Sequence, residues 1–166
     1  MLKNQLLQDT NLAQVLFEQA PIGLGISNMQ GKLLMYNKML LQISGFTPED
    51  IEKINSVADL YYDPTDRDTI LKNTMEKGFT DKYPVKFKKK DGSFFESLFS
   101  LRRILIHGEP HWLALIQDVS EQNASEQKMQ ETIKELEAMN EMMINRELKM
   151  AELKSEIDEL KQKLKQ

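Results

Sequence analysis

All seven glycines and all five prolines of this 166-residue chain lie at or before Pro110, and the last aromatic residue is Trp112. Residues 123–166 are mostly Glu, Lys, Leu, Met, Gln and Ala, which are good helix formers. A stretch without turn residues or aromatic side chains forms a long helix more readily than a compact core. The sequence therefore predicts a folded first part and a helical second part, which meet within residues 113–128.

The overall composition narrows the classes of function. A hydrophobic fraction of 40% allows a core, and a net charge of -4 without a basic block argues against nucleic-acid binding. The chain has no cysteine, which excludes disulfides, thiolate metal sites and a cysteine nucleophile, and fits a reducing compartment. No stretch approaches the roughly 20 apolar residues of a membrane span, and the first residues lack the pattern of a signal peptide. We therefore expect a cytoplasmic protein with no nucleic-acid partner.

Hydrophobic spacing and turn residues predict mixed helices and strands before residue 122. Residues 1–20 are expected to form an N-terminal amphipathic helix, broken after residue 8 and stopped before Pro21. Asn37 and Thr47 are typical N-cap residues that predict short helices directly after them, and Asp63 predicts a longer helix that runs to Lys77 and is closed by Gly78. Alternating apolar residues predict five strands, at 22–27, 33–36, 85–88, 94–106 and 112–117. This order indicates an α+β fold with a five-stranded antiparallel sheet and helices on one face.

The landmarks of the first part, taken in order, resemble those of a PAS domain. They are IGLGIS at 22–27, SGFTPED at 44–50, DPTDR at 63–67, KKDGS at 89–93 and DVSEQ at 118–122. PAS domains are sensory and dimerisation modules that hold a small ligand between sheet and helices and pass a change to a flanking helix. The resemblance implies a PAS sensor domain at 21–122 and a C-terminal coiled-coil signalling helix at 123–166. Residues 145–154 are similar to helical extensions of bacterial and archaeal sensory proteins.

Matched to the family pattern, alternate strand residues would face the helices and a ligand. The candidate pocket comprises Gly25, Ser27, Leu33, Met35, Leu40, Val85, Phe87, Ser97, Phe99, Leu101, Ala114 and Ile116. Gly23 and Gly25 could leave room for a ligand, because glycine inside a strand often marks a close approach. The alternative is that larger side chains such as Leu40, Phe99 and Trp112 fill the space. The apolar character of the predicted lining slightly favours this filled core.

The other face of the predicted sheet is also apolar. The side chains expected to point away from the helices are Leu24, Ile26, Leu98, Leu113 and Leu115. A patch of this kind is rarely left in water, so we expect the N-terminal helix or a partner subunit to cover it.

The residues that cofactor-binding PAS domains require are missing. The flavin class needs a reactive cysteine and a glutamine, whereas this chain has no cysteine and has Ile116 at the position that matches the glutamine. Haem-binding members usually take a histidine from the long helix within the PAS domain. The matching helix in this sequence is the one predicted after Asp63, and it contains no histidine. His107 and His111 flank a turn and are weak metal candidates without further ligands. We therefore expect no cofactor, no metal and no enzymatic activity, and an unknown small ligand is the alternative to a core filled by side chains.

From residue 136 onward, apolar residues recur at alternating steps of three and four, which is typical of a coiled coil. This seam comprises Leu136, Met139, Met143, Arg146, Met150, Leu153, Ile157, Leu160 and Leu164. A single amphipathic helix lying on its own domain is the alternative, but the seam is narrow and the segment is long. We expect a homodimeric coiled coil that is weaker around Arg146 and stronger from Leu153. Ile133 is one step off the seam, which predicts a change of register close to the domain.

Residues 118–121, here called the exit segment, join the last predicted strand to the long helix. Ser120 is placed to act as the helix N-cap, and Glu121 adds a favourable charge near the helix N-terminus. The resemblance implies a further role for Asp118, which would tie the end of the sheet to the domain body and relay a change in the sheet to the helix. We therefore predict a signalling module that dimerises through its coil and outer sheet face and acts on a kinase or regulator. A ligand-free scaffold, or a fragment of a sensor histidine kinase or transcription regulator, is the alternative.

Overall fold

The structure, a computed structural model, describes residues 10–163. Its elements are α2 (Thr10–Glu18), β1 (Gly23–Asn28), β2 (Leu33–Tyr36), α3 (Lys38–Ser44), α4 (Pro48–Lys53), the 3-10 helix η1 (Val57–Leu60), α5 (Pro64–Lys77), β3 (Phe79–Lys88), β4 (Phe94–Ile106), β5 (Glu109–Asp118) and α6 (Ser120–Lys163). The helix predicted at residues 2–8 and the last seam residue, Leu164, lie outside the described residues.

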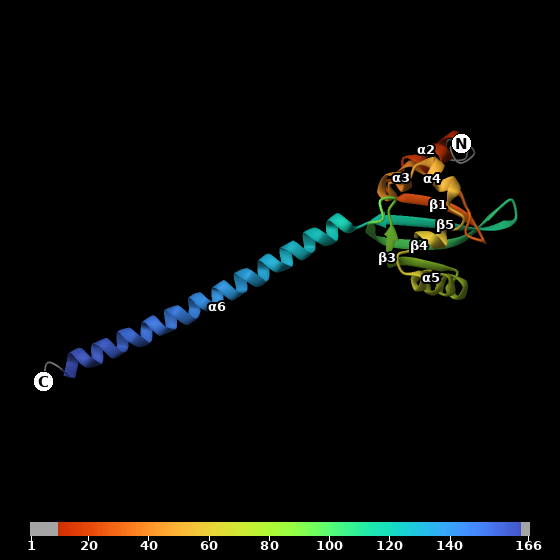
Figure 1. The fold of residues 1–166 in the computed structure, drawn as a ribbon. Helices are drawn as coiled ribbons and strands as arrows, with labels where there is room; N and C mark the ends of the chain where they lie inside the picture. Colours follow the sequence, from red (N-terminus) through yellow and green to blue (C-terminus); the bar gives the residue numbers. More distant parts are fainter. Residues whose placement is uncertain (1–9, 164–166) are drawn as a thin grey trace, which may run out of the picture. The chain divides into compact units, whose positions relative to one another are not determined.

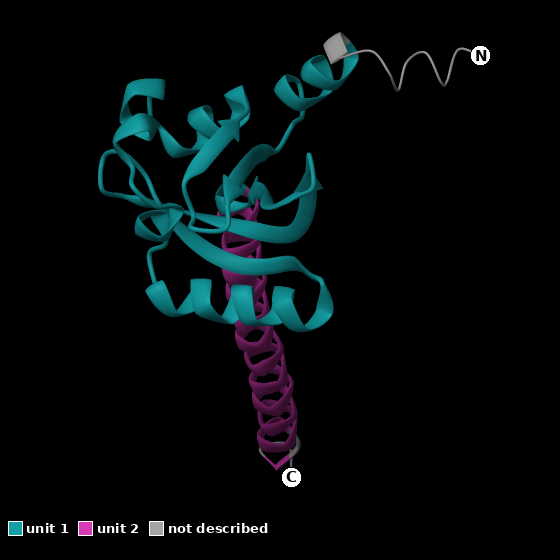
Figure 2. Cartoon of the chain, turned by 90° about the vertical axis from the view of Figure 1, so that its right-hand side faces the viewer, with its two compact units in different colours: residues 1–121 teal, residues 122–166 magenta. Residues whose placement is uncertain are grey.

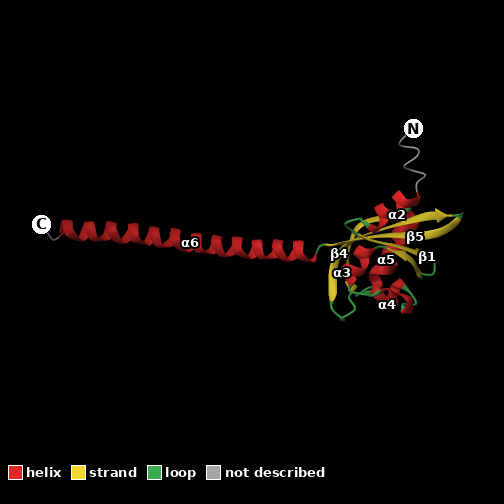
Figure 3. Cartoon of the chain, turned by 90° about the horizontal axis from the view of Figure 1, so that it is seen from above, coloured by secondary structure: helices red, strands yellow, loops and turns green. Residues whose placement is uncertain are grey.

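The five strands form one antiparallel sheet in the order β2–β1–β5–β4–β3, which Figure 1 shows in the middle of the folded part. Helix α3 packs on β1, and α5 packs on β3 and β4. Figure 3 shows α3, α4 and α5 together on one side of the sheet and α2 apart from them. The predicted α+β fold, with its five-stranded antiparallel sheet, is confirmed.

The short helices begin where the capping residues predict. The Thr47 hydroxyl accepts a hydrogen bond from Asp50 N, and the Asp50 carboxylate accepts one from Thr47 N, which makes a complete capping box. The Asp63 carboxylate accepts a hydrogen bond from Thr65 N at the start of α5, and Gly78 ends that helix with a φ of 82°. These local bonds fix the residue at which each helix begins, and Gly78 fixes the residue at which α5 ends.

Asn37 connects three elements through a single buried side chain. Its Oδ1 accepts hydrogen bonds from Leu24 N in β1 and Leu40 N in α3, at 2.9 Å and 3.0 Å. Its Nδ2 donates to Phe17 O at the end of α2 and to Ile22 O, at 3.0 Å and 2.9 Å. The prediction that Asn37 caps the following helix is confirmed, and the same residue also joins α2 and β1 to that helix.

A β-bulge in β2 changes the face on which Met35 lies. Ile26 pairs with Met35, but the next residue, Ser27, pairs with Leu33, so Leu34 is an extra residue in the ladder. Met35 therefore shares the outer face with Ile26, and 51% of its surface is exposed. The prediction that Met35 faces the helices is wrong, because strict alternation along β2 does not hold across the bulge.

A second irregularity lies in β3, which begins at Phe79, earlier than the alternation at residues 85–88 indicates. Lys82 has a φ of 47°, and the register shifts between Thr80 and Tyr83. Ser100 of β4 holds this bulge, because its hydroxyl accepts a hydrogen bond from Lys82 N and donates one to the Asp81 carboxylate. The bulge interrupts the period of two, which is why the first half of the strand has no clear sequence pattern.

The core lies between the inner face of the sheet and helices α3 and α5. Ile70 of α5 is completely buried, and Phe95 is 2% exposed. Aromatic rings form much of the remainder, with Phe87 in contact with Tyr61 at 4.8 Å and with Phe99 at 5.4 Å between ring centroids. Burial of this apolar surface is the main contribution to the stability of the folded part.

The outer face of the sheet carries the apolar pairs that the sequence predicts. Leu24 pairs with Leu115, and Ile26 pairs with Leu113, on neighbouring strands. These four side chains are half-buried in the single chain. On α2, which the sequence offers as their cover, Val15 and Leu16 are 48% and 64% exposed. That the face is covered by the N-terminal helix or by a partner subunit stays a prediction.

The chain divides into two compact units between Glu121 and Gln122, shown in separate colours in Figure 2. The first unit contains the sheet and the short helices, and the second contains nearly all of α6. Each is described by itself below. Within residues 10–163, every helix is too short or too polar to cross a lipid bilayer.

Candidate functional site

A cavity of about 80 Å³ lies within the first unit, between the inner face of the sheet and the helical layer. Strands β1, β2, β3, β4 and β5 supply one wall, and α3, η1 and α5 supply side chains of the other. Most of the predicted pocket residues line this cavity. They are Gly25, Ser27, Leu33, Leu40, Phe87, Phe99, Leu101, Ala114 and Ile116. The five strands and α3 bring these residues together.

Three of the predicted pocket residues do not line the cavity. Met35 is on the outer face, as the bulge in β2 requires. Val85 and Ser97 are buried on the inner face, with 3% and 2% of their surface exposed, but they pack in the core next to each other. The Ser97 hydroxyl donates a hydrogen bond to Val85 O at 3.0 Å. These two residues therefore stabilise the pairing of β3 with β4 and offer no polar atom to a ligand.

The two glycines of β1 allow α3 to approach the sheet closely. A Cβ atom on Gly23 would lie 3.0 Å from Ile43 Cδ1 and 3.2 Å from Leu40 Cδ1, so side chains of α3 occupy that space. A Cβ atom on Gly25 would lie 3.2 Å from Leu33 Cδ1. Gly25 borders the cavity, whereas Gly23 does not, and the expectation that Gly23 leaves room for a ligand is wrong.

Sequence reasoning missed four polar residues of the lining, Ser44, Tyr61, Arg67 and Lys88, of which Tyr61 and Arg67 matter most for the site. Tyr61 follows η1 and forms an isolated β-bridge with Phe87, which no local pattern predicts. Arg67 lies in the first turns of α5, four residues after the Asp63 cap. Arg67 and Leu71 are one turn apart on the same face of α5, and both line the cavity.

The titration of Tyr61 depends on burial and on the charges near it. Burial raises the pKa of the Tyr61 hydroxyl above its usual value, the positive charge of Arg67 lowers it, and the negative charge of Asp66 raises it. Burial has the larger effect, so Tyr61 keeps its proton at neutral pH and is able to donate a hydrogen bond. The pKa of the Asp66 carboxyl is itself raised, first by burial and then by the nearby Asp63.

The exit segment is joined to the sheet by hydrogen bonds that the sequence does not predict. The Ser120 hydroxyl accepts a hydrogen bond from Glu96 N of β4 at 2.9 Å. Val119 N donates to Glu96 O, also at 2.9 Å, and Val119 is 7% exposed. The prediction that the Ser120 hydroxyl caps α6 is therefore wrong, because this hydroxyl extends the β4–β5 ladder by one step into the helix.

Asp118 takes the capping role instead. Its carboxylate accepts a hydrogen bond from Ser120 N at 2.9 Å, which is the local Asx-type bond that starts a turn or helix. Asp118 is exposed, and Glu121 is the acidic residue of the first turn. The link between the sheet and α6 thus runs through Val119 and Ser120, and Asp118 shapes the start of the helix.

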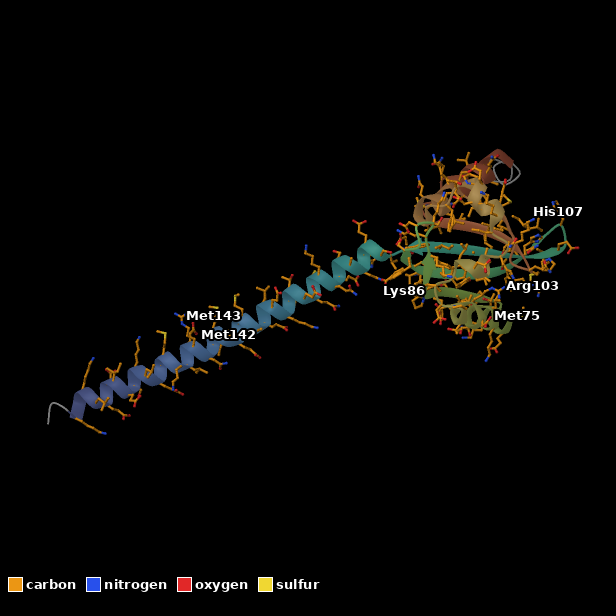
Figure 4. The ribbon with its side chains drawn as sticks, in the orientation of Figure 1. Met75, Lys86, Arg103, His107, Met142 and Met143 are labelled. Carbon is orange, nitrogen blue, oxygen red and sulfur yellow. The ribbon has the colours of Figure 1, made fainter. Side chains whose placement is uncertain are left out.

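The seam residues from Leu136 to Leu160, which the structure describes, are exposed in the single chain. Leu136, Met139 and Met143 have 60%, 61% and 57% of their surface exposed, and Arg146 is exposed as well. Met150, Leu153, Ile157 and Leu160 are between 47% and 54% exposed. Ile133, which lies off the seam, is 46% exposed. Figure 4 shows Met143 standing away from the helix axis, with its neighbour Met142 beside it.

The two histidines lie in the β4–β5 hairpin. His107 has a φ of 51° and occupies the hairpin tip, where Figure 4 labels it. His111 Nδ1 is 2.9 Å from Glu109 O. Across the described range 10–163, no group of three or more His, Cys, Asp or Glu side chains is placed to hold a metal ion.

Comparisons with known proteins agree with this geometry. The family model described as PAS domain matches residues 21–121, which is more than half of the chain. No curated protein matches the chain. The matched range contains the whole cavity and ends within the exit segment.

Solved structures share the fold at low sequence identity. A PAS domain from a two-component sensor histidine kinase is 12% identical with a TM-score of 0.58, and the alignment covers 71% of this chain and 99% of that one. A PAS domain of an HTR-like protein from Haloarcula marismortui is 20% identical with a TM-score of 0.54, over 70% and 96% of the two chains. A domain of a sensory box sensor histidine kinase/response regulator from Geobacter sulfurreducens is 19% identical with a TM-score of 0.55, over 71% and 97%. Such low identities establish the fold alone. The family model matches more than half of the chain, and the chain therefore belongs to the PAS domain family.

Proposed function

We propose that this chain is a sensory and dimerisation module in intracellular signal transduction. A small molecule in the cavity of residues 21–121 changes the end of the sheet, and the change passes through the exit segment to a coiled coil formed by α6 of two copies. The output is a kinase or regulator, either in the same polypeptide beyond these residues or as a separate partner. The likeness to PAS domains of sensor histidine kinases supports this assignment.

The observation that carries the proposal is the hydrogen bonding of α6 to a strand that lines the cavity. Phe95, next to Glu96 in β4, borders the cavity, and Glu96 is bonded to Val119 and to the Ser120 hydroxyl. Ile116 borders the cavity from β5, two residues before Asp118. A ligand that displaces either strand end by a fraction of an ångström therefore acts directly on the first turn of α6.

A dimer is proposed because α6 leaves its apolar seam uncovered. An exposed apolar stripe that recurs every three and four residues is stable when it packs against an equivalent stripe. Met at seam positions tolerates several packings because its side chain is unbranched and flexible. The half of the coil nearest the domain, which contains Met139 and Met143, is therefore the part where a change of rotation costs least.

The small size of the cavity favours a second candidate function. A volume of about 80 Å³ is smaller than the roughly 150 Å³ of an engineered protein cavity that binds benzene. A ligand-free PAS scaffold, which dimerises and positions a partner without sensing a small molecule, is compatible with such a filled core.

Native mass spectrometry of the full chain tests the proposal, because it reports stoichiometry and any retained small molecule together. We expect a dimer that carries a small additional mass. The variant Ala114→Leu fills the cavity and should give a dimer without that mass, whereas the matched change Ala138→Leu, on α6 away from the seam, should retain it. A wild-type dimer with no retained mass would support the scaffold instead, and retention by Ala114→Leu would place the ligand elsewhere.

A further inference from the structure

The cavity contains buried polar groups whose hydrogen-bonding capacity is unused. Ser27 and Tyr61 are 6% and 5% exposed and border the cavity, and neither hydroxyl takes part in a hydrogen bond within residues 10–163. The indole N–H of Trp112, 5% exposed, is likewise unpartnered there. No polar side-chain atom that is fully sealed from solvent and cavities lacks a partner in this part of the chain. The three groups therefore retain access to open space, and all three can donate a hydrogen bond.

Arg67 adds a positive charge to the same lining. Its side chain is half-buried and forms no ion pair with a carboxylate in the described part of the chain. The guanidinium lies over the β1–β2 turn, where its Nη2 is 3.8 Å from the position that a Cβ atom of Gly31 would take. Ser27 is the last inward-facing residue of β1 before that turn. The cation and the free Ser27 hydroxyl thus border the cavity at the same end of β1.

The charges of the lining are of one sign. Besides Arg67, Lys88 borders the cavity, and its Nζ donates a hydrogen bond to Asp59 O at 3.3 Å. No Asp, Glu, Asn or Gln belongs to the lining, so the cavity is bordered by no anionic side chain and no side-chain amide. Asp66 and Asp68 flank Arg67 in α5, Asp63 caps that helix, and none of these three acids lines the cavity. The remainder of the lining is apolar.

We propose that the cavity binds a small ionised carboxylic acid with an apolar body of a few carbons. Its carboxylate accepts hydrogen bonds from the Arg67 guanidinium and from the Ser27 or Tyr61 hydroxyl, and its body lies among Phe99, Ala114 and Ile116. A guanidinium fork matches the geometry of a carboxylate, and burial of that charge is favourable only when such donors receive it. The small volume of the cavity limits the body to a short or compact chain. This inference rests on the proposed sensory function, for which it names the ligand class.

Three probes with one body and different head groups test the inference on the full chain: sodium butanoate, 1-butanol and butylammonium chloride, at constant ionic strength. Calorimetry should give a dissociation constant for butanoate about tenfold or more below that for butanol, because the charged head meets unpartnered donors. Butylammonium should bind most weakly. The variant Arg67→Gln should bring the affinity for butanoate to that for butanol and leave butanol unchanged. Arg102→Gln, on the outer face beside Phe79, is the matched control and should behave as wild type.

The outcomes separate this inference from the proposed function. Equal affinities of the wild type for butanoate and butanol would overturn the acid class while leaving a ligand-binding cavity in place. An equal loss in Arg102→Gln and Arg67→Gln would show a general charge effect and would also overturn it. A retained natural ligand that mass spectrometry identifies as neutral or cationic would also overturn the acid class. Failure of all three probes together with no retained mass in the wild type would overturn the sensory function itself. A Tyr61→Phe variant that still folds and loses butanoate affinity, but not butanol affinity, would further support the assignment.

Discussion

The first unit and the helix treat their large apolar side chains in opposite ways. In residues 21–121, Ile70 and Phe95 are almost completely buried, whereas every large apolar side chain of α6 from Met129 to Leu160 is about half exposed or more. The first unit buries a core within one chain, whereas the large apolar side chains of α6 remain exposed in the single chain and, in the proposed dimer, would be covered by a second copy. A change in the core should therefore act on folding, whereas a change on the seam should act on assembly. The following predictions test this separation, from the largest effect to the smallest.

The largest effect is expected on the seam. In Leu153→Lys with Leu160→Lys, two apolar residues of each chain become charged, and burial of those charges against each other in a coil is strongly unfavourable. We expect monomers at micromolar concentration by sedimentation, with an unchanged spectrum of the folded part. Ala151→Lys with Ser155→Lys adds the same charge on the other side of the helix and should remain dimeric. A Leu153, Leu160 double variant that stays dimeric would show that the coil is not the dimer contact.

A change in the core should have the next largest effect and should not alter assembly. Ile70 is fully buried in α5, so Ile70→Ala removes packing and leaves a cavity, at a cost of about 2–5 kcal/mol of unfolding free energy. Met75, in the same helix, is 69% exposed, and Met75→Ala should change stability by less than about 0.5 kcal/mol. Denaturant unfolding at several protein concentrations measures both. If Ile70→Ala also abolishes the dimer while still folded, the separation between the two units is incorrect.

A smaller effect is expected where the two regions meet. Ser120→Ala removes the acceptor for Glu96 N and should cost about 1 kcal/mol, while Ser120→Thr keeps the hydroxyl and should cost less. Ser125→Ala, on the exposed part of α6, is the matched control.

The role of the exit segment in signalling can be measured directly. The chain has no cysteine, so Ala138→Cys, next to Met139 but away from the seam, accepts a single spin label per chain, and the distance between labels across the proposed dimer can be followed. We expect this distance to change on removal of the ligand in the wild type and to stop changing in Ser120→Ala. A response in Ser120→Ala equal to that of the wild type would reduce the exit segment to a structural cap.

The smallest effect concerns surface ion pairs. Hydrogen bonds from Lys90 and then from Thr47 lower the pKa of the Asp50 carboxyl to about 2. A carboxyl whose pKa is lower in the folded state stabilises the fold above its unfolded pKa of roughly 4, and this contribution disappears as the pH falls toward 2. Lys90→Met should therefore lower the melting temperature slightly at pH 6 and have no effect near pH 2. Lys149→Met removes the exposed pair with Glu152 on α6 and should have no measurable effect at either pH.

The sequence was informative wherever one residue type forces one local geometry. The caps at Asn37, Thr47 and Asp63 and the alternation in β4 led directly to the elements and to the fold. The errors lie where a single extra residue shifts the pattern. The bulge at Leu34 moves Met35 to the outer face, and the bulge at Lys82 conceals the first half of β3.

The candidate site was only partly predictable for a different reason. Side chains on regular strands, such as Phe99 and Ile116, follow from strand parity once the fold is known. Tyr61 and Arg67 enter the cavity from a loop and a helix whose positions depend on tertiary packing. The bond between Ser120 and Glu96 joins residues 24 positions apart, and a serine before a helix is equally well explained by an ordinary cap.

The buried side chain of Asn37 has a consequence for the local opening of the fold. One oxygen atom protects the amide hydrogens of Leu24 and Leu40 at the same time, although these residues belong to a strand and a helix. Rotation of this single side chain exposes both amides, so they should exchange with deuterium at a common rate set by one opening event. Because Leu40 borders the cavity, a bound molecule that restrains it should slow the exchange of Leu24 by the same factor, which provides a measure of occupancy from an amide outside the cavity lining.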